Sequence, residues 1–172
     1  MKVQRIGQSP GDDGIRETLL TMQKLIFASD KNRVIKDTAR RIIAGLSPAD
    51  ELGQIAAVFA WVKKNMRYVR DYYNIEELTG PDQIVYNIRN GYETHSSDCD
   101  DFAMVEAALL RSIGFKTRLE AVAVRNPLNY NHARVSVYSQ KLERWIPLEG
   151  TKPGSFVGYA LPSERNILTL EV

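Results

Sequence analysis

The only cysteine of the chain, Cys99, stands in a polar run that directly precedes a long apolar stretch. That position predicts the first turn of a helix, where free backbone N–H groups and the positive end of the helix dipole favour a thiolate and can hold a developing oxyanion. His132 follows 33 residues later and Glu149 another 17 residues on, each in an apolar or alternating run. A cysteine, a histidine and a carboxylate in this order form a candidate catalytic triad of nucleophile, base and orienting acid.

Three aspartates flank the thiol in the sequence. We interpret Asp98 as the N-cap, which makes Cys99 the first helical residue and lets the Asp101 carboxylate bond back to the amide of the cap. Nearby anions raise the pKa of a thiol, whereas the helix dipole lowers it. Because successive helical side chains are about 100° apart, we expect Asp100 and Asp101 to face away from the sulfur at a solvated helix start.

Each candidate also has an ordinary structural interpretation. A lone cysteine is most often a small buried residue, and a glutamate at a strand end is most often solvated. Strict alternation places His132 on the strand face opposite Ala133, so either that face meets the helix or a bulge turns the ring. The other histidine, His95, lies four residues before Cys99 in a polar stretch, and we assign it to a loop because it would need a tight reversal to act as the base.

Metal and cofactor chemistry is not favoured by the sequence. Cysteine, histidine and aspartate are zinc ligands, but one cysteine and one well-placed histidine match no paired-ligand spacing. The three aspartates are too close together for a helix-loop-helix calcium loop, and no phosphate-binding or dinucleotide-binding glycine motif occurs. We therefore expect neither a metal nor a cofactor.

Hydrophobic periodicity predicts the elements that would position these residues. Helices are expected over residues 15–26 and 34–43, then over 48–66 with Ser47 as the cap, Pro48 at the first position and apolar spacing from Ile55 to Met66, and a short helix over 83–89. The helix that begins at Cys99 is apolar nearly all round and ends at Gly114. Strands are expected over 117–125, 132–138, 144–148 and 167–172, with a hairpin turn at 140–143. Helices followed by consecutive strands predict an α+β fold, in which the N-terminal helices and a central buried helix pack on a mainly antiparallel sheet.

Composition limits the class of protein. With 172 residues, 44% of them hydrophobic, the chain is expected to form one domain over residues 1–172. Its 23 basic and 21 acidic residues leave a charge of +2 with no block of one sign, which argues against nucleic acid and membrane surfaces as partners. One cysteine closes no intramolecular disulfide, and no signal peptide or membrane-spanning run occurs, so we expect a cytoplasmic protein. Nothing in the sequence indicates the oligomeric state.

Four motifs in order resemble those of the transglutaminase-like superfamily, within the papain-like cysteine-enzyme architecture. They are Asp98-Cys99-Asp100-Asp101-Phe102-Ala103, Leu109-Leu110-Arg111-Ser112-Ile113-Gly114-Phe115, His132-Ala133 and Trp145-Ile146-Pro147-Leu148-Glu149. The resemblance covers a motif-bearing core of about residues 52–150 and is strongest to compact prokaryotic and bacteriophage-encoded members. It implies that Cys99 is the nucleophile, His132 the base and Glu149 the residue that orients the base.

The resemblance implies cysteine-dependent acyl transfer on amide bonds of a protein or peptide substrate, through a thioester, as in a peptidase, deamidase or transglutaminase. The alternative is an inactive domain of the same fold that serves in binding or in phage or bacterial assembly. Three residues depart from the family pattern: Ser97 replaces a frequent glycine, Arg134 a frequent aromatic residue, and Glu149 the usual aspartate. A glutamate is one methylene longer, so it serves only if the strand ends are offset to suit.

Overall fold

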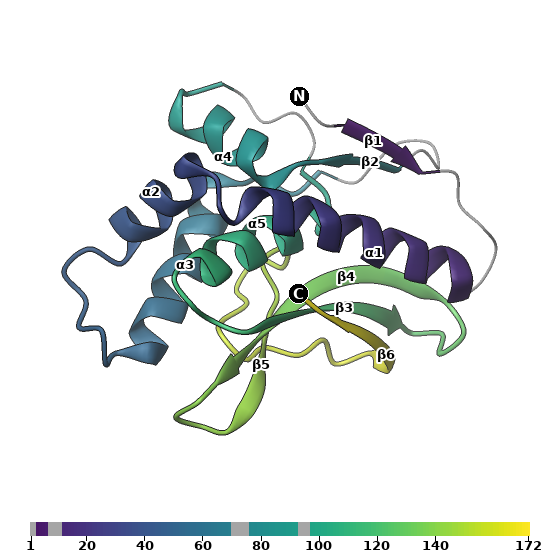
Figure 1. Cartoon of the computed structure of the whole chain (residues 1–172). Helices are drawn as coiled ribbons and strands as arrows, with labels where there is room; N and C mark the ends of the chain where they lie inside the picture. Colours follow the sequence, from purple (N-terminus) through teal and green to yellow (C-terminus); the bar gives the residue numbers. More distant parts are fainter. Residues whose placement is uncertain (1–2, 7–11, 70–75, 93–96) are drawn as a thin grey trace.

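The computed structural model describes residues 3–6, 12–69, 76–92 and 97–172. Within them, the helices lie on one side of an antiparallel four-stranded sheet (Figure 1). The helices are α1 (Asp12–Ser29), α2 (Arg33–Ile42), α3 (Glu51–Asn65), α4 (Pro81–Arg89) and α5 (Cys99–Ser112). The sheet has the order β5-β4-β3-β6, with β3 (Thr117–Val124), β4 (Tyr130–Ser139), β5 (Arg144–Leu148) and β6 (Glu164–Glu171). A separate antiparallel pair joins β1 (Val3–Ile6) to β2 (Glu76–Thr79). The predicted α+β class is confirmed.

Helix α5 forms the centre of the fold. Every residue from Asp100 to Leu110 is buried, and the helix contacts α1, α2, α3 and α4 as well as β3 and β4. An apolar surface all round is what allows a helix to be covered on every side. The chain leaves the helix at Gly114, whose φ of 98° is a left-handed conformation that glycine adopts without strain.

Strand β4 separates an apolar inner face from a charged outer face. Ala133, Val135 and Val137 belong to the core with α5, whereas the alternate residue Arg134 pairs with Glu120 of β3, with 2.7 Å between its Nε and a carboxylate oxygen. Both members of that pair are almost wholly buried. The register with β3 shifts beside His132, where Val122 faces His132 and the next pairing skips Asn131. This register shift is a β-bulge, one of the two ways predicted from the sequence for the His132 ring to face the helix.

Most predicted boundaries agree with the structure, and the differences have local causes. The cap of α3 is Asp50, whose carboxylate accepts the Gly53 amide at 3.0 Å, so the prediction of Ser47 as cap was wrong. Ser47 instead accepts the Ala49 amide in the preceding turn. Strand β3 stops at Val124 because Arg125 has a φ of 72°. The β1–β2 pair was not predicted, since four-residue strands carry too little alternation to be recognised.

In the described part of the chain, no helix combines the length and the apolar character that a membrane crossing requires.

Candidate active site

The predicted helix start at Cys99 is confirmed. Asp98 is the N-cap of α5, and its Oδ1 accepts the amides of Asp100 and Asp101 at 3.0 and 3.1 Å. These two bonds satisfy donors that the helix cannot pair itself, and they fix Cys99 as the first helical residue. The segment before the cap is held as well, because the Val69 amide donates to the Ser97 carbonyl at 3.1 Å.

His132 and Glu149 meet across the β4–β5 hairpin. His132 Nε2 lies 2.7 Å from Glu149 Oε2, and the histidine side chain is 13% exposed while the glutamate is fully buried. The register of the hairpin, in which Val135 faces Leu148, brings Glu149 to the beginning of β4. The longer acid therefore reaches the imidazole. Because Nε2 is bound to the carboxylate, Nδ1 is the ring nitrogen left for exchange with a nucleophile.

The sulfur of Cys99 lies against β4 at the residue that follows the histidine. The backbone amide of Ala133 donates a hydrogen bond to this sulfur, and Cys99 packs against the core while remaining half-buried. All three candidate residues are thus at one end of the sheet: Cys99 from the helical layer, His132 from β4 and Glu149 from the end of β5. The structure brings together the residues that the sequence singled out.

The electrostatics around the thiol differ from the prediction. Burial raises the pKa of Cys99 well above its usual value, the charges of Asp100 and Asp98 raise it further, and the Ala133 amide lowers it. The Cys99 Sγ donates to Asp100 Oδ1 at 3.7 Å. The expectation of a solvated helix start was therefore wrong, because Asp100 and Asp101 are both buried, and Asp100 contacts the sulfur instead of facing away from it. Burial and the carboxylates of Asp100 and Asp98 favour the neutral thiol over the thiolate.

Glu149 is an ionised carboxylate in a closed environment. Burial alone would raise its pKa, but the hydrogen bond and charge of His132, the Thr151 hydroxyl and the charge of Arg134 together lower it. Thr151 Oγ1 donates to Oε1 at 2.5 Å, so each carboxylate oxygen has a partner. Thr151 was not singled out in the sequence; its position two residues after the acid is the only signal that could have indicated it.

A second buried carboxyl, Glu106, lies behind the triad acid. It is fully buried, and neither oxygen has a hydrogen-bond partner among the described residues. Burial and the charge of Glu149 raise its pKa well above the usual value, while Lys63 lowers it. A Cβ placed on Gly150 would come within 2.8 Å of Glu106 Oε1 and 2.8 Å of a Phe102 ring carbon, so only glycine fits beside them. Glu106 is a polar residue in a helix that is otherwise mostly apolar, and the prediction of the site made no use of this sequence signal.

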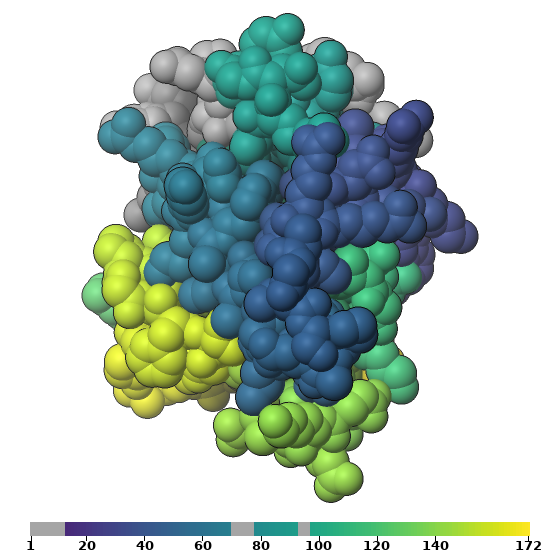
Figure 2. Space-filling view, turned by 90° about the vertical axis from the view of Figure 1, so that its left-hand side faces the viewer, coloured from purple at the N-terminus to yellow at the C-terminus, as the bar shows by residue number. Residues whose placement is uncertain are grey.

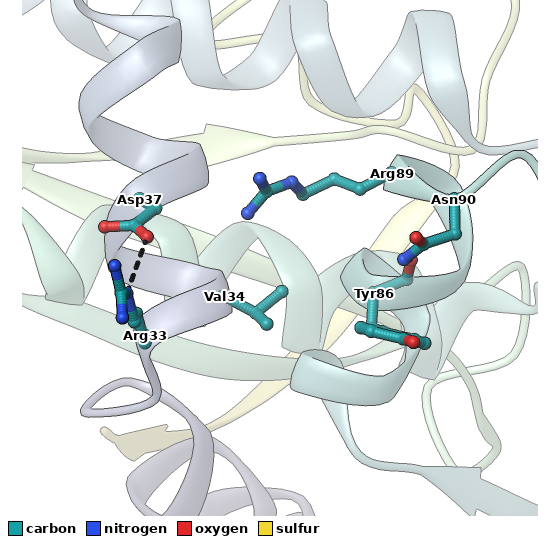
Figure 3. A pocket seen from close by; sticks show the side chains of 6 residues that line it. All are labelled: Arg33, Val34, Asp37, Tyr86, Arg89 and Asn90. Atoms are coloured by element: carbon teal, nitrogen blue, oxygen red, sulfur yellow. Dashed lines mark hydrogen bonds and ion pairs between the residues drawn. The ribbon is translucent and has the colours of Figure 1, made fainter.

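A hollow of about 330 Å³ lies elsewhere, between α2 and α4. Figure 3 shows Arg89 of α4 extending toward α2 above Val34, beside the ion pair of Arg33 with Asp37. The hollow shares no residue with the triad. Among the residues that the structure describes, no group of three histidine, cysteine, aspartate or glutamate side chains has the arrangement of a metal site. His95 lies outside the described residues.

Comparison with known proteins points to one family. The family model of the transglutaminase-like superfamily matches residues 36–150, a span that begins within α2 and ends directly after Glu149. A search among curated proteins gave no significant match.

Two solved structures share the fold. One is a presumptive cysteine protease from Cytophaga hutchinsonii, 15% identical, with a TM-score of 0.53 over 99% of this chain; the chain spans 62% of the length of that structure. The other is LapG of Legionella pneumophila in its calcium-bound form, 19% identical, with a TM-score of 0.54 over 86% of this chain and 80% of LapG. Identities this low support the fold alone. With the family match covering most of the chain, the protein belongs to the transglutaminase-like superfamily.

Proposed function

We propose that the protein is a cysteine hydrolase or acyltransferase that acts on an amide bond of a protein or peptide. Cys99 is the nucleophile, His132 the general base and Glu149 the residue that orients the base. The observation that carries this proposal is the 2.7 Å contact of His132 with a buried Glu149, with the sulfur of Cys99 bound to the amide of the next residue along β4. An ionised buried acid on Nε2 favours the tautomer whose Nδ1 accepts a proton.

The reaction follows from these positions. His132 Nδ1 takes the proton of the thiol as the sulfur attacks the amide carbon, which forms a C–S bond and a tetrahedral oxyanion. On the first turn of α5, the amides of Asp100 and Asp101 are bound to Asp98, so the Cys99 amide is the donor that the cap leaves for the oxyanion. The C–N bond then breaks and the amine leaves with the proton from the imidazolium. Water or a second amine attacks the thioester and regenerates the thiol.

A neutral resting thiol fits a mechanism in which the proton moves during the attack. The pKa of Cys99 is held up by burial and by two carboxylates, which disfavours a preformed thiolate–imidazolium pair. Substrate that covers the first turn of α5 would change this environment. General-base transfer to His132 is then the step by which the nucleophile forms.

Iodoacetamide alkylation tests the coupling between thiol and imidazole, and the single cysteine makes the product unambiguous. We expect His132→Gln to slow alkylation of Cys99 near neutral pH and to change its pH profile. Identical profiles for the unsubstituted protein and His132→Gln would contradict the assignment of the base. Cleavage of a peptide library, abolished by Cys99→Ala, would establish the reaction itself.

The burial and anionic surroundings of the thiol favour one alternative, an inactive domain of the same fold that binds a protein partner. In that case Cys99→Ala and His132→Ala would leave binding and every assayable function intact. Loss of turnover in Cys99→Ala with an unchanged fold excludes this alternative.

A further inference from the structure

The connection that follows Glu149 is tied to helix α3 by a single lysine. Lys63 Nζ lies 2.8 Å from the Lys152 carbonyl oxygen, 3.1 Å from the Ser155 carbonyl oxygen and 2.6 Å from Ser155 Oγ. In Figure 2 the yellow surface of this connection lies directly against the blue surface of α3. We call residues 149–155, together with Lys63, the α3 strap.

The ammonium group of Lys63 is fully used by the strap. An ammonium has three hydrogens, and each of the three acceptors can take one. A flexible lysine loses rotamer freedom when it is held in this way, so an arrangement that satisfies every donor implies a defined backbone around it. The lysine is half-buried, which strengthens the charge-assisted bonds relative to a solvated surface.

Ser155 carries the link from the lysine to the triad acid. Its hydroxyl accepts from Lys63 and has one hydrogen of its own to donate, and Ser155 Oγ lies 2.5 Å from the Glu149 carbonyl oxygen and 2.8 Å from the Lys152 carbonyl oxygen. The shorter contact identifies the Glu149 carbonyl as the preferred acceptor. Because the cation polarises the hydroxyl, the bond to the Glu149 carbonyl is strengthened.

The other side of the strap has no room to move. Glu106 and Phe102 of α5 pack against the α-carbon of Gly150, directly after the triad acid, closely enough to exclude a side chain. The carboxylate itself is held by Thr151 and His132. Both the backbone and the side chain of Glu149 are therefore fixed, the backbone through Ser155 and Lys63.

We propose that Lys63 is a positioning residue, which through Ser155 fixes the backbone of Glu149 so that its carboxylate meets His132. The catalytic meaning of this placement rests on the proposed function. The placement itself is testable without catalysis, because the hydrogen bond between His132 and Glu149 gives its own spectroscopic signal.

The test observes the ring N–H proton of His132 by NMR. A proton held in a short bond to a carboxylate is shifted downfield and protected from exchange, and the chain has only two histidines, so His132→Gln assigns the signal. We expect Lys63→Met and Ser155→Ala each to cause loss or a large upfield shift of this resonance. In the double variant, the loss or shift of the resonance should be no larger than in the more severe single variant, because both substitutions break the same linkage. Lys64→Met, at the exposed neighbouring position, is the matched control and should leave the resonance unchanged.

Ser155→Thr keeps the hydroxyl and should retain the resonance. Retention of the resonance at its original position in both Lys63→Met and Ser155→Ala, whatever their melting temperatures, would overturn the proposal, as would a rapidly exchanging proton in the unsubstituted protein. Should Lys63→Met not fold, Ser155→Ala removes one oxygen atom and decides the question alone. The alkylation experiment separates the two proposals, since an inert Cys99 thiol would refute the enzyme but leave the NMR result standing; the resonance and its response to Lys63→Met should also persist in Cys99→Ala protein.

Discussion

Replacement of Glu106 by glutamine should stabilise the protein, increasingly so as the pH rises. Glu106 is fully buried, and neither of its oxygens has a hydrogen-bond partner in the described part of the chain. Its pKa is raised, first by burial and then by the charge of Glu149, with Lys63 opposing. Glutamine has nearly the shape of the protonated acid and cannot ionise, so the substitution isolates the contribution of that proton.

The sign follows from the proton balance. In the unfolded chain Glu106 ionises above a pKa of about 4.3, whereas in the folded protein it keeps its proton to higher pH. Unfolding then releases one proton, and the free energy of unfolding falls by about 1.4 kcal/mol per pH unit until the pH reaches the raised value. In the Glu106→Gln variant, the free energy of unfolding does not fall with pH for this reason, because glutamine does not ionise. In a domain of this size, the difference in melting temperature should grow by roughly 3–6 °C per pH unit.

Urea unfolding of both proteins at half-unit steps from pH 4 to pH 8 measures the difference, and subtraction cancels every other titrating group. Glu120→Gln is the control, because the pKa of Glu120 is shifted in the opposite direction from that of Glu106. The pKa of Glu120 is lowered, because Arg134 and Ser136 outweigh the effect of burial. Its stabilising contribution is present above the unfolded pKa and is lost as the pH falls through the folded one, so Glu120→Gln should be least harmful in acid.

A difference between Glu106→Gln and the unsubstituted protein that stays constant from pH 5 to pH 8 would refute this reasoning. It would mean that Glu106 titrates in the folded protein as it does in the unfolded chain, and hence that the carboxyl reaches water or an unrecognised cation.

Three further predictions concern the triad and its surroundings. Asp100→Asn removes a charge that raises the pKa of Cys99, so alkylation by iodoacetamide at pH 7 should become faster; an unchanged rate would show that the charge of Asp100 does not control the thiol. Glu149→Asp restores the residue usual in the family but withdraws the carboxylate from its 2.7 Å contact with His132, so turnover should fall, and a gain in turnover would count against the observed geometry. Gly150→Ala places a methyl group 2.8 Å from a carboxyl oxygen and a ring carbon and should lower the free energy of unfolding by about 1–3 kcal/mol. An unchanged free energy of unfolding in urea denaturation would contradict the close packing.

The helix start at Cys99 and the meeting of His132 with Glu149 could be predicted because their signals are local. An aspartate cap before an apolar run predicts a helix start at Cys99 from a few neighbouring residues. His132 and Glu149 stand at the ends of runs that alternate or are apolar, and one hairpin between them is enough to bring their ends together.

The surroundings of the triad depend on segments that are distant in the sequence and were not predictable. Asp100 and Asp101 are buried although they stand in a polar run at a helix start, and no periodicity in the sequence predicts that burial. Lys63 is 86 residues from Glu149 and looks like any charged residue in the last turn of a helix. Glu106 is polar at a position where every neighbour is apolar, which indicates an exception without saying what faces it.

The division of the triad between two layers has a mechanical consequence. His132 and Glu149, the proposed base and acid, belong to one hydrogen-bonded hairpin and move as a unit, whereas Cys99, the proposed nucleophile, is carried by the helix packed on that hairpin. A small shear of one layer over the other would change the gap between sulfur and imidazole without breaking the bond between imidazole and carboxylate. In the proposed reaction, the path of the first proton therefore depends on how the two layers sit, linked by the hydrogen bond of the Ala133 amide to the sulfur, whereas the orientation of His132 depends on the hairpin.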